Sequence, residues 1–139
     1  MVQRRIMLLL DNLVIRREIF SYAIDLALRM ESSLYLLVLL YVTPKTLKAD
    51  CQEAERVLND FLEKSRQQNV EVHGTIRQGD PASELLKYLA ESRPFQAIIW
   101  GGKEQLLRNK STPVRTHWLE QIRKRLECPV VVPTLKEKL

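Results

Sequence analysis

The chain is poor in cysteine, glycine and aromatic residues. Its 139 residues include two cysteines, four glycines and an aromatic share of 6%. No CxxC pair or cluster of cysteine and histidine occurs, so the sequence indicates neither a zinc site nor a disulfide framework. Cys51 and Cys128 are expected to be reduced and to pack as small hydrophobic side chains. We expect Trp100 and Trp118 in the core, rather than as platforms on which bases stack.

Long hydrophobic runs are also lacking. The apolar run at residues 6–10 is stopped by Asp11 and is too short for the core of a signal peptide. The longest uncharged stretch, residues 32–44, is too short to span a bilayer. These observations predict a cytoplasmic protein with no membrane partner.

Basic residues are only slightly in excess. The chain has 22 Lys and Arg residues against 17 Asp and Glu residues, for a net charge of +5. This charge permits an anionic partner, but it lacks the dense clustering of dedicated nucleic-acid binders, so nucleic acid is not an expected partner. The length and a hydrophobic share of 45% predict a single domain over residues 1–139, with a core that needs no metal or disulfide.

The chain contains a regular alternation of two hydrophobic patterns. Short runs predict strands at residues 6–10, 34–42, 70–77, 95–100 and 130–132. Between them, apolar residues recur every three or four positions and predict helices at about residues 15–30, 47–68, 81–91 and 113–126. This alternation predicts an α/β fold: a five-stranded parallel sheet with helices on both faces.

The hydrophobic patterns also predict the order of the strands. The first, second and fourth runs are almost entirely apolar, which is typical of central strands buried on both faces. The third alternates with polar residues and the fifth lies between Pro129 and Pro133, which favours edge positions. The predicted order is 3-2-1-4-5, with a ligand crevice beyond the carboxyl ends of strands one and four. Its expected lining is Asp11–Leu13, Val42–Pro44 and Gly101–Lys103.

Four motifs resemble those of the universal stress protein family. The first strand ends on Asp11, Gly79-Asp80-Pro81 opens the third helix with Asp80 as its cap, strand four ends at Gly101, and residues 128–133 read Cys-Pro-Val-Val-Val-Pro. In this order they cover essentially the whole chain. The resemblance implies a Rossmann-like fold of the adenine nucleotide alpha hydrolase type and a non-enzymatic role in the stress response or in regulation. No acid–base pair or activated nucleophile is visible, so we predict no catalytic and no metal-binding residue.

One departure from the family concerns ATP. Members that bind ATP carry the pattern G-x2-G-x9-G-[S/T] after strand four, because glycines let backbone N–H groups approach phosphate oxygens. Here Glu104 or Gln105 stands at the second glycine position, and no glycine follows Gly102. The expectation is therefore that ATP is not bound in the usual manner and that no cofactor is held. Asp11 matches the family residue that contacts adenosine, and its alternative role is to cap the first helix.

An alternative is an ATP- or AMP-binding switch in which basic side chains replace the missing glycines. The residues of this hypothetical nucleotide site are Asp11, Asn12, Val42, Gly101, Gly102, Lys103, Arg108, Lys110 and Ser111. The competing interpretation is that this basic stretch is an ordinary solvated loop. Non-specific binding of nucleic acid by the loop and the last helix is a weaker alternative.

The last strand predicts an interface between copies of the chain. An edge strand of valines offers unpaired backbone groups to another strand, and family members often dimerise there. We expect a two-fold homodimer with an antiparallel strand pair across the axis. The interface residues would be Pro129, Val130, Val131, Val132 and Pro133. The competing interpretation is a short edge protected by its prolines. The identity of further protein partners does not follow from the sequence.

Overall fold

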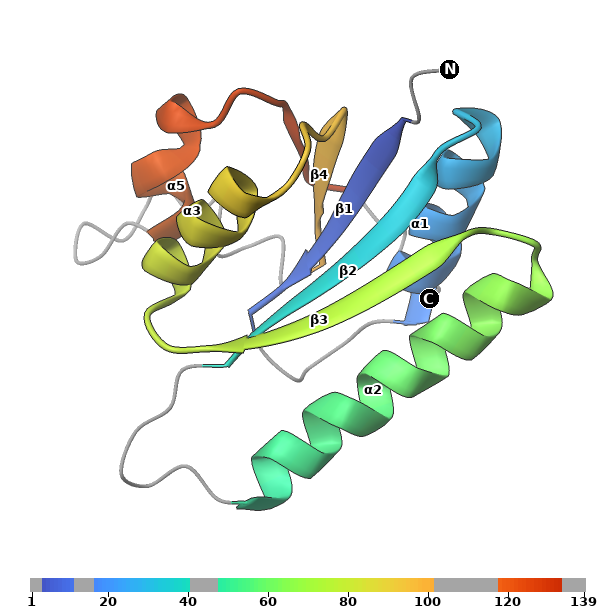
Figure 1. Ribbon diagram of the computed structural model, residues 1–139. Coiled ribbons are helices and arrows are strands. Elements are labelled where there is room, and N and C mark those ends of the chain that lie inside the picture. The colour runs from blue at the N-terminus through green and yellow to red at the C-terminus, as the bar shows by residue number, and fades with distance from the viewer. Residues whose placement is uncertain (1–3, 12–16, 41–47, 102–117, 134–139) are drawn as a thin grey trace, which may run out of the picture.

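The computed structural model describes residues 4–11, 17–40, 48–101 and 118–133. Its sheet has five parallel strands in the order β3-β2-β1-β4-β5, as predicted (Figure 1). The strands are β1 (Arg5–Leu10), β2 (Ser33–Leu40), β3 (Val72–Gln78), β4 (Ala97–Trp100) and β5 (Val130–Val131). The described helices are α1 (Arg17–Arg29), α2 (Lys48–Gln67), α3 (Pro81–Glu91), α5 (Trp118–Ile122) and the 3-10 helix η1 (Arg123–Arg125).

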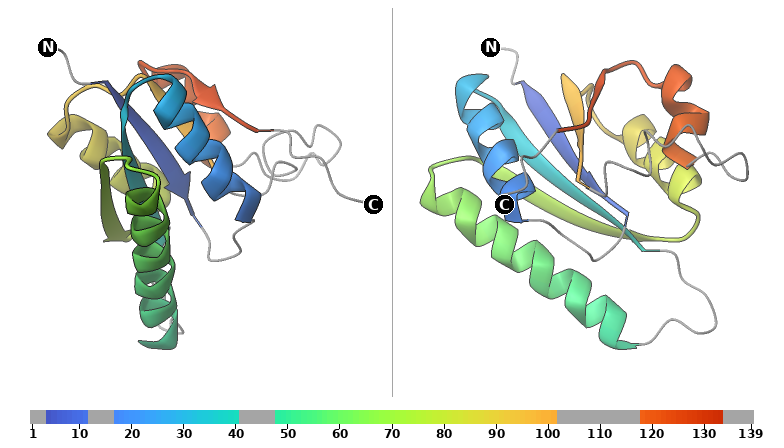
Figure 2. Two further views of the ribbon diagram at one scale, coloured as in Figure 1. Left: turned by 90° about the vertical axis from the view of Figure 1, so that its right-hand side faces the viewer. Right: turned by 180° about the vertical axis from the view of Figure 1, so that it is seen from behind.

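Helices cover both faces of the sheet. Helices α1 and α2 lie on one face and α3 and α5 on the other (Figures 1 and 2). The packing of β1 explains why residues 6–10 are all apolar: Ile6 and Leu8 pack toward α1 and α2, whereas Met7 and Leu9 pack toward α3 and α5. All four side chains are fully buried. The prediction that this strand is central is confirmed.

Several predicted boundaries were wrong by a few residues. The third strand begins at Val72 instead of Val70, because the Val70 N–H bonds to the Ser65 carbonyl (3.1 Å) in the turn that ends α2. Asn69 makes this turn with a positive φ of 60°. The fourth strand begins at Ala97, after Phe95, and the fifth ends at Val131.

The last helix is shorter and less regular than predicted. Within the described residues, α5 ends at Ile122 and the chain tightens into η1. The Leu126 N–H then bonds to the Arg123 carbonyl at 3.2 Å, so Leu126 no longer belongs to a helix. The predicted start of this helix lies outside the described residues.

Helix α3 begins as its sequence predicts. The Ser83 N–H donates to Asp80 Oδ2 at 3.0 Å, and Pro81 occupies the first turn. These hydrogen bonds from Ser83 hold the pKa of Asp80 below its ordinary value. Gly79 has a φ of 140°, a conformation that L side chains rarely adopt, which accounts for the glycine before the cap.

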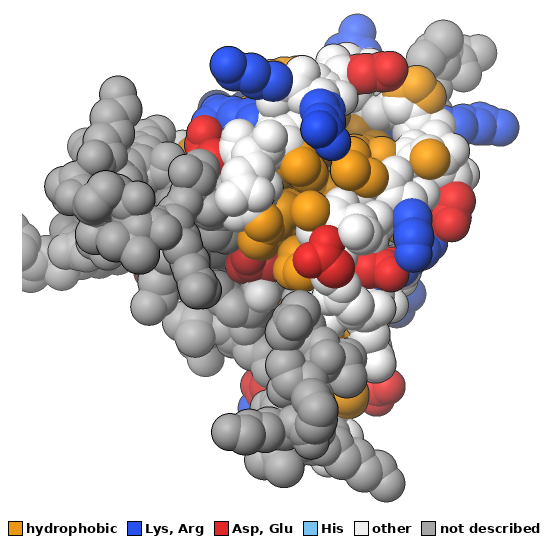
Figure 3. Space-filling model, turned by 90° about the vertical axis from the view of Figure 1, so that its left-hand side faces the viewer, with side chains coloured by type: hydrophobic (Ala, Val, Ile, Leu, Met, Phe, Trp, Pro, Cys, Tyr) orange, Lys and Arg blue, Asp and Glu red, His pale blue; other side chains and the backbone are white. Residues whose placement is uncertain are grey.

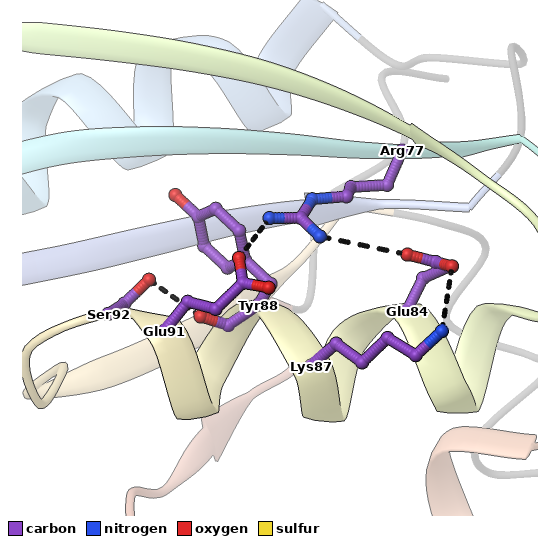
Figure 4. Close-up of polar contacts among 6 residues, drawn as sticks. All are labelled: Arg77, Glu84, Lys87, Tyr88, Glu91 and Ser92. Carbon is purple, nitrogen blue, oxygen red and sulfur yellow. Dashed lines mark hydrogen bonds and ion pairs between the residues drawn. The ribbon is translucent and has the colours of Figure 1, made fainter.

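A charged cluster joins α3 to the edge strand β3 (Figure 4). The Arg77 guanidinium reaches from β3 to the Glu91 carboxylate and lies 3.8 Å from Glu84 Oε2. It also covers the Tyr88 ring, 5.5 Å from the ring centroid. Arg77 therefore connects the carboxyl end of β3 to both ends of the helix that follows it.

Candidate functional site

The carboxyl ends of β1 and β4 lie side by side where the strand order reverses. The register pairs Leu9 with Trp100, so Asp11 and Gly101 follow at the same edge of the sheet. The Gly101 N–H donates to the Leu9 carbonyl at 2.8 Å and extends the pairing by one residue. The structure therefore places two of the predicted site residues at the crevice position of an open α/β sheet.

Gly101 is explained by packing alone. A Cβ atom at this position would overlap Leu10 Cδ2, lie 3.1 Å from the Leu9 carbonyl oxygen and lie 3.2 Å from Leu8 Cδ1. The residue is also buried. No phosphate is needed to account for this glycine, so its presence is weak support for a nucleotide site.

Asp11 makes a contact that sequence reasoning missed. Trp118, the first described residue of α5, donates its indole N–H to Asp11 Oδ2 at 2.8 Å. The Trp118 ring packs edge-on against the buried Trp100, with ring centroids 6.3 Å apart. The acid that the family resemblance assigns to adenosine thus holds a side chain of its own chain, 107 residues away.

Trp100 lies in the core, as predicted, whereas Trp118 is half-buried, packs against the same core cluster and also has a polar role. Its ring packs against the cluster beneath α3 and α5 while its N–H reaches the crevice edge. A half-buried tryptophan usually finds an acceptor for its indole N–H. This rule predicts from the sequence that the Trp118 indole N–H has an acceptor, but it does not say which residue the acceptor belongs to.

The other predicted nucleotide-site residues lie outside the described residues. They are Asn12, Val42, Gly102, Lys103, Arg108, Lys110 and Ser111. Of the predicted set, the structure brings together only Asp11 and Gly101 among the residues it describes.

The predicted dimer edge is shorter and better covered than the sequence indicates. Val130 is 8% exposed, and Val132 packs against the same core cluster. Arg123 of η1 donates to the Val130 carbonyl at 3.1 Å and pairs with Glu120 at 2.8 Å. The Val130 carbonyl of strand β5 is therefore already hydrogen-bonded to the Arg123 guanidinium.

Within the described residues, one glutamate bonds to both a serine and a histidine. Glu71 accepts hydrogen bonds from both Ser33 (2.9 Å) and His73 (3.2 Å), so that the serine is not paired with the histidine. His73 stacks on Tyr35 instead, with ring centroids 4.8 Å apart. No group of three metal-ligating side chains occurs within the described ranges. None of the helices described there is both long and apolar enough to cross a membrane.

Comparison with known proteins establishes the fold. No family model and no curated protein matches the chain. It is similar to the solved structure of the universal stress protein UspA from Lactobacillus plantarum, with 14% identity, a TM-score of 0.71, and 95% of this chain and 99% of that chain covered. It is also similar to the universal stress protein from Archaeoglobus fulgidus in complex with dAMP, with 19% identity, a TM-score of 0.67, and 95% and 98% covered.

A plant protein has the same architecture. The universal stress protein family protein from Arabidopsis thaliana with AMP bound is 17% identical, with a TM-score of 0.59 and with 93% of this chain and 90% of that chain covered. At these identities the likeness shows the fold: the chain has the universal stress protein fold, a Rossmann-like five-stranded parallel sheet. The resemblance inferred from the four motifs is confirmed at this level.

Proposed function

We propose that this chain is a universal stress protein-like regulatory or stress-response protein of the cytoplasm, which acts as a dimer without catalysis and does not hold ATP in the usual family manner. The observation that carries the proposal is the hydrogen bond between Asp11 and Trp118. Asp11 matches the residue that contacts adenosine in the family, and here it accepts a hydrogen bond from the Trp118 indole of the same chain. The substitution of the loop glycines by Glu104 or Gln105 supports the same conclusion.

The first experiment is thermal unfolding of the purified protein with and without millimolar Mg-ATP, together with chromatography of any nucleotide released on denaturation. The expected result is no shift of the midpoint and no released nucleotide. A ligand at about one hundred times its Kd stabilises the folded state by about 3 kcal/mol, so that binding would be readily visible. A reproducible upward shift, or co-purified ATP, would contradict the proposal.

A second candidate function is a switch that binds ATP or AMP. It is favoured by the complexes with dAMP, AMP and cAMP among solved structures of the same fold. It is also favoured by the place of Asp11 and Gly101 at the crevice edge. In this hypothesis Asp11 leaves Trp118 to hold the adenosine, and Lys103, Arg108 or Lys110 holds the phosphates.

The two functions are separated by Asp11→Ala. If the wild-type protein binds nucleotide, the switch hypothesis expects this variant to lose the midpoint shift, because the adenosine contact is gone. The matched control is Asp25→Ala, which removes an acid from the surface of α1, far from the carboxyl ends of the strands. A shift that persists in Asp11→Ala excludes Asp11 as the adenosine ligand.

A further inference from the structure

A cavity lies at the end of the sheet opposite Asp11. Its volume is about 270 Å³, and it lies between α3 and the segments that lead into β4 and β5. The lining comes from the second half of α3, from residues 92–95 before β4 and from residues 125–128 before β5. Since Asp11 follows the carboxyl end of β1, this cavity is separate from the nucleotide crevice.

The floor of the cavity is apolar. Leu86, Leu89 and Ala90 line it from α3, and Phe95 and Leu126 line it from the neighbouring segments. Phe95 is 6% exposed and belongs to the core cluster under α3. The face of the molecule with α3 and α5 shows apolar side chains gathered beside Lys and Arg side chains (Figure 3). Such a floor favours the burial of an apolar group.

Two arginines line this cavity. Arg93 lines it from the turn after α3 and Arg125 from η1, and both are exposed. Within the described residues neither makes a hydrogen bond or an ion pair, whereas Arg77 and Arg123 are both paired. Glu127 is the one carboxylate in the lining, so two positive charges oppose one negative charge.

We propose that this cavity binds a small amphipathic anion, whose apolar body lies among Leu86, Leu89 and Leu126 and whose carboxylate is held by Arg93 and Arg125. Arginine suits this role because its planar guanidinium forms paired hydrogen bonds with a carboxylate. The volume is slightly below the roughly 300–1,000 Å³ of typical ligand pockets, which favours a chain of about eight carbons or a single aromatic ring. This inference does not depend on the proposed function.

The apolar body and the carboxylate of the ligand should contribute differently to binding. Ion pairs with exposed arginines contribute little to affinity, so the apolar body supplies most of it. The arginines instead select the sign of the charge. The site should therefore discriminate between ligands of the same length and opposite charge.

The test uses octanoate and, as its match in length, octylammonium. Each is titrated into isotope-labelled protein while the methyl NMR signals of Leu86, Leu89 and Ala90 are followed. Leu34 and Leu36, which are buried on the other face of the sheet, serve as internal references. The expected result is a saturable shift of the three cavity methyl signals with octanoate and a weaker, non-saturating response to octylammonium. Equal responses to the two probes would overturn the proposal.

Variants test the arginines directly. Arg93→Gln combined with Arg125→Gln should weaken octanoate binding about three- to tenfold, because two exposed ion pairs are lost. Lys124→Gln is the matched control: it removes one positive charge from the same 3-10 helix but does not line the cavity. It should leave the affinity unchanged. Glu127→Gln should strengthen binding, since it removes the only repelling carboxylate in the lining. An equal loss in Lys124→Gln would show a general charge effect and overturn the site.

Cysteine alkylation provides an independent readout. Cys128 lines the cavity and Cys51 lies on the other side of the sheet, so each reports a different place in the same molecule. Octanoate should slow alkylation of Cys128 and leave that of Cys51 unchanged. Because burial raises the pKa of the Cys128 thiol, the reaction is best followed at mildly alkaline pH. An equal slowing of alkylation at Cys128 and Cys51 would contradict binding at this cavity.

Discussion

At the scale of single residues, Gly101 and Asp11 show that residues resembling a family motif can have structural roles of their own. Gly101 follows β4, where the Leu10 side chain and the Leu9 carbonyl leave no room for a Cβ atom. Asp11 follows β1 and accepts a hydrogen bond from Trp118. Both residues match the universal stress protein pattern, yet both have structural partners within the chain. A motif residue at the crevice therefore needs a binding measurement before it is assigned to a ligand.

Gly101→Ala should destabilise the protein. The added methyl group would overlap Leu10 Cδ2 and approach the Leu9 carbonyl, in a part of the core that is fully buried. Overpacking of this kind costs about 1–3 kcal/mol, measured as the free energy of unfolding in urea. Gly74→Ala is the comparison, because the atoms nearest to its Cβ, at 2.5–3.3 Å, all belong to the Leu58 side chain, which is only partly buried and can move more easily than the core at Gly101. A loss in Gly101→Ala no larger than that in Gly74→Ala would show that the sheet has room for a side chain there.

The residue scale is also where sequence reasoning was weakest. The contact between Asp11 and Trp118 joins residues 107 positions apart, and hydrophobic periodicity carries no information on such a pair. The same applies to Arg93 and Arg125, which come from separate segments and meet at one cavity. In both cases the site depends on how the elements pack and not on any local pattern.

At the scale of elements, the sequence predicted much more. Strands buried on both faces read as unbroken apolar runs, and an edge strand reads as an alternating one, so the order of the strands followed from burial. Boundaries were less predictable because an apolar residue also packs in a turn. Val70 and Phe95 are both buried, yet each lies before its strand.

The Asp80 cap of α3 should make the stability of the protein depend on pH. Because hydrogen bonds from Ser83 lower the pKa of Asp80 below its ordinary 3.8, the charged carboxylate stabilises the fold. This contribution is present above the ordinary pKa and is lost as the pH falls through the lower value of the folded state. Asp80→Asn keeps a capping side chain that does not titrate. The unfolding free energy of the wild type should exceed that of Asp80→Asn near pH 7, and the difference should shrink as the pH falls below about 4.

Urea unfolding of both proteins from pH 7 to pH 2.5 measures this difference. Glu63→Gln is a suitable control, since Glu63 is an acidic residue of α2 that does not cap a helix. A difference between the wild type and Asp80→Asn that is constant over the whole pH range would contradict the assigned role of Asp80.

At the scale of the whole molecule, the open question is how the sheet ends at β5. The Ile98 N–H donates to the Pro129 carbonyl, so the next carbonyl, that of Val130, faces away from β4. This is the acceptor that a second copy would use in an antiparallel strand pair, and Arg123 now occupies it at 3.1 Å. Dimerisation through β5 therefore requires the guanidinium to leave the carbonyl to the partner strand.

Arg123→Gln tests this competition. If the chain dimerises through β5, the variant should associate more tightly than the wild type, by about fivefold, because a hydrogen bond of about 1 kcal/mol no longer has to be broken. Sedimentation equilibrium at micromolar concentrations measures the two dissociation constants, with Lys124→Gln as a control for the lost charge. If Arg123→Gln associates more weakly than the wild type, Arg123 instead contributes a stabilising contact to the interface. Monomers in all three proteins would mean that β5 stays unpaired even without the Arg123 guanidinium, and would contradict the proposed dimer.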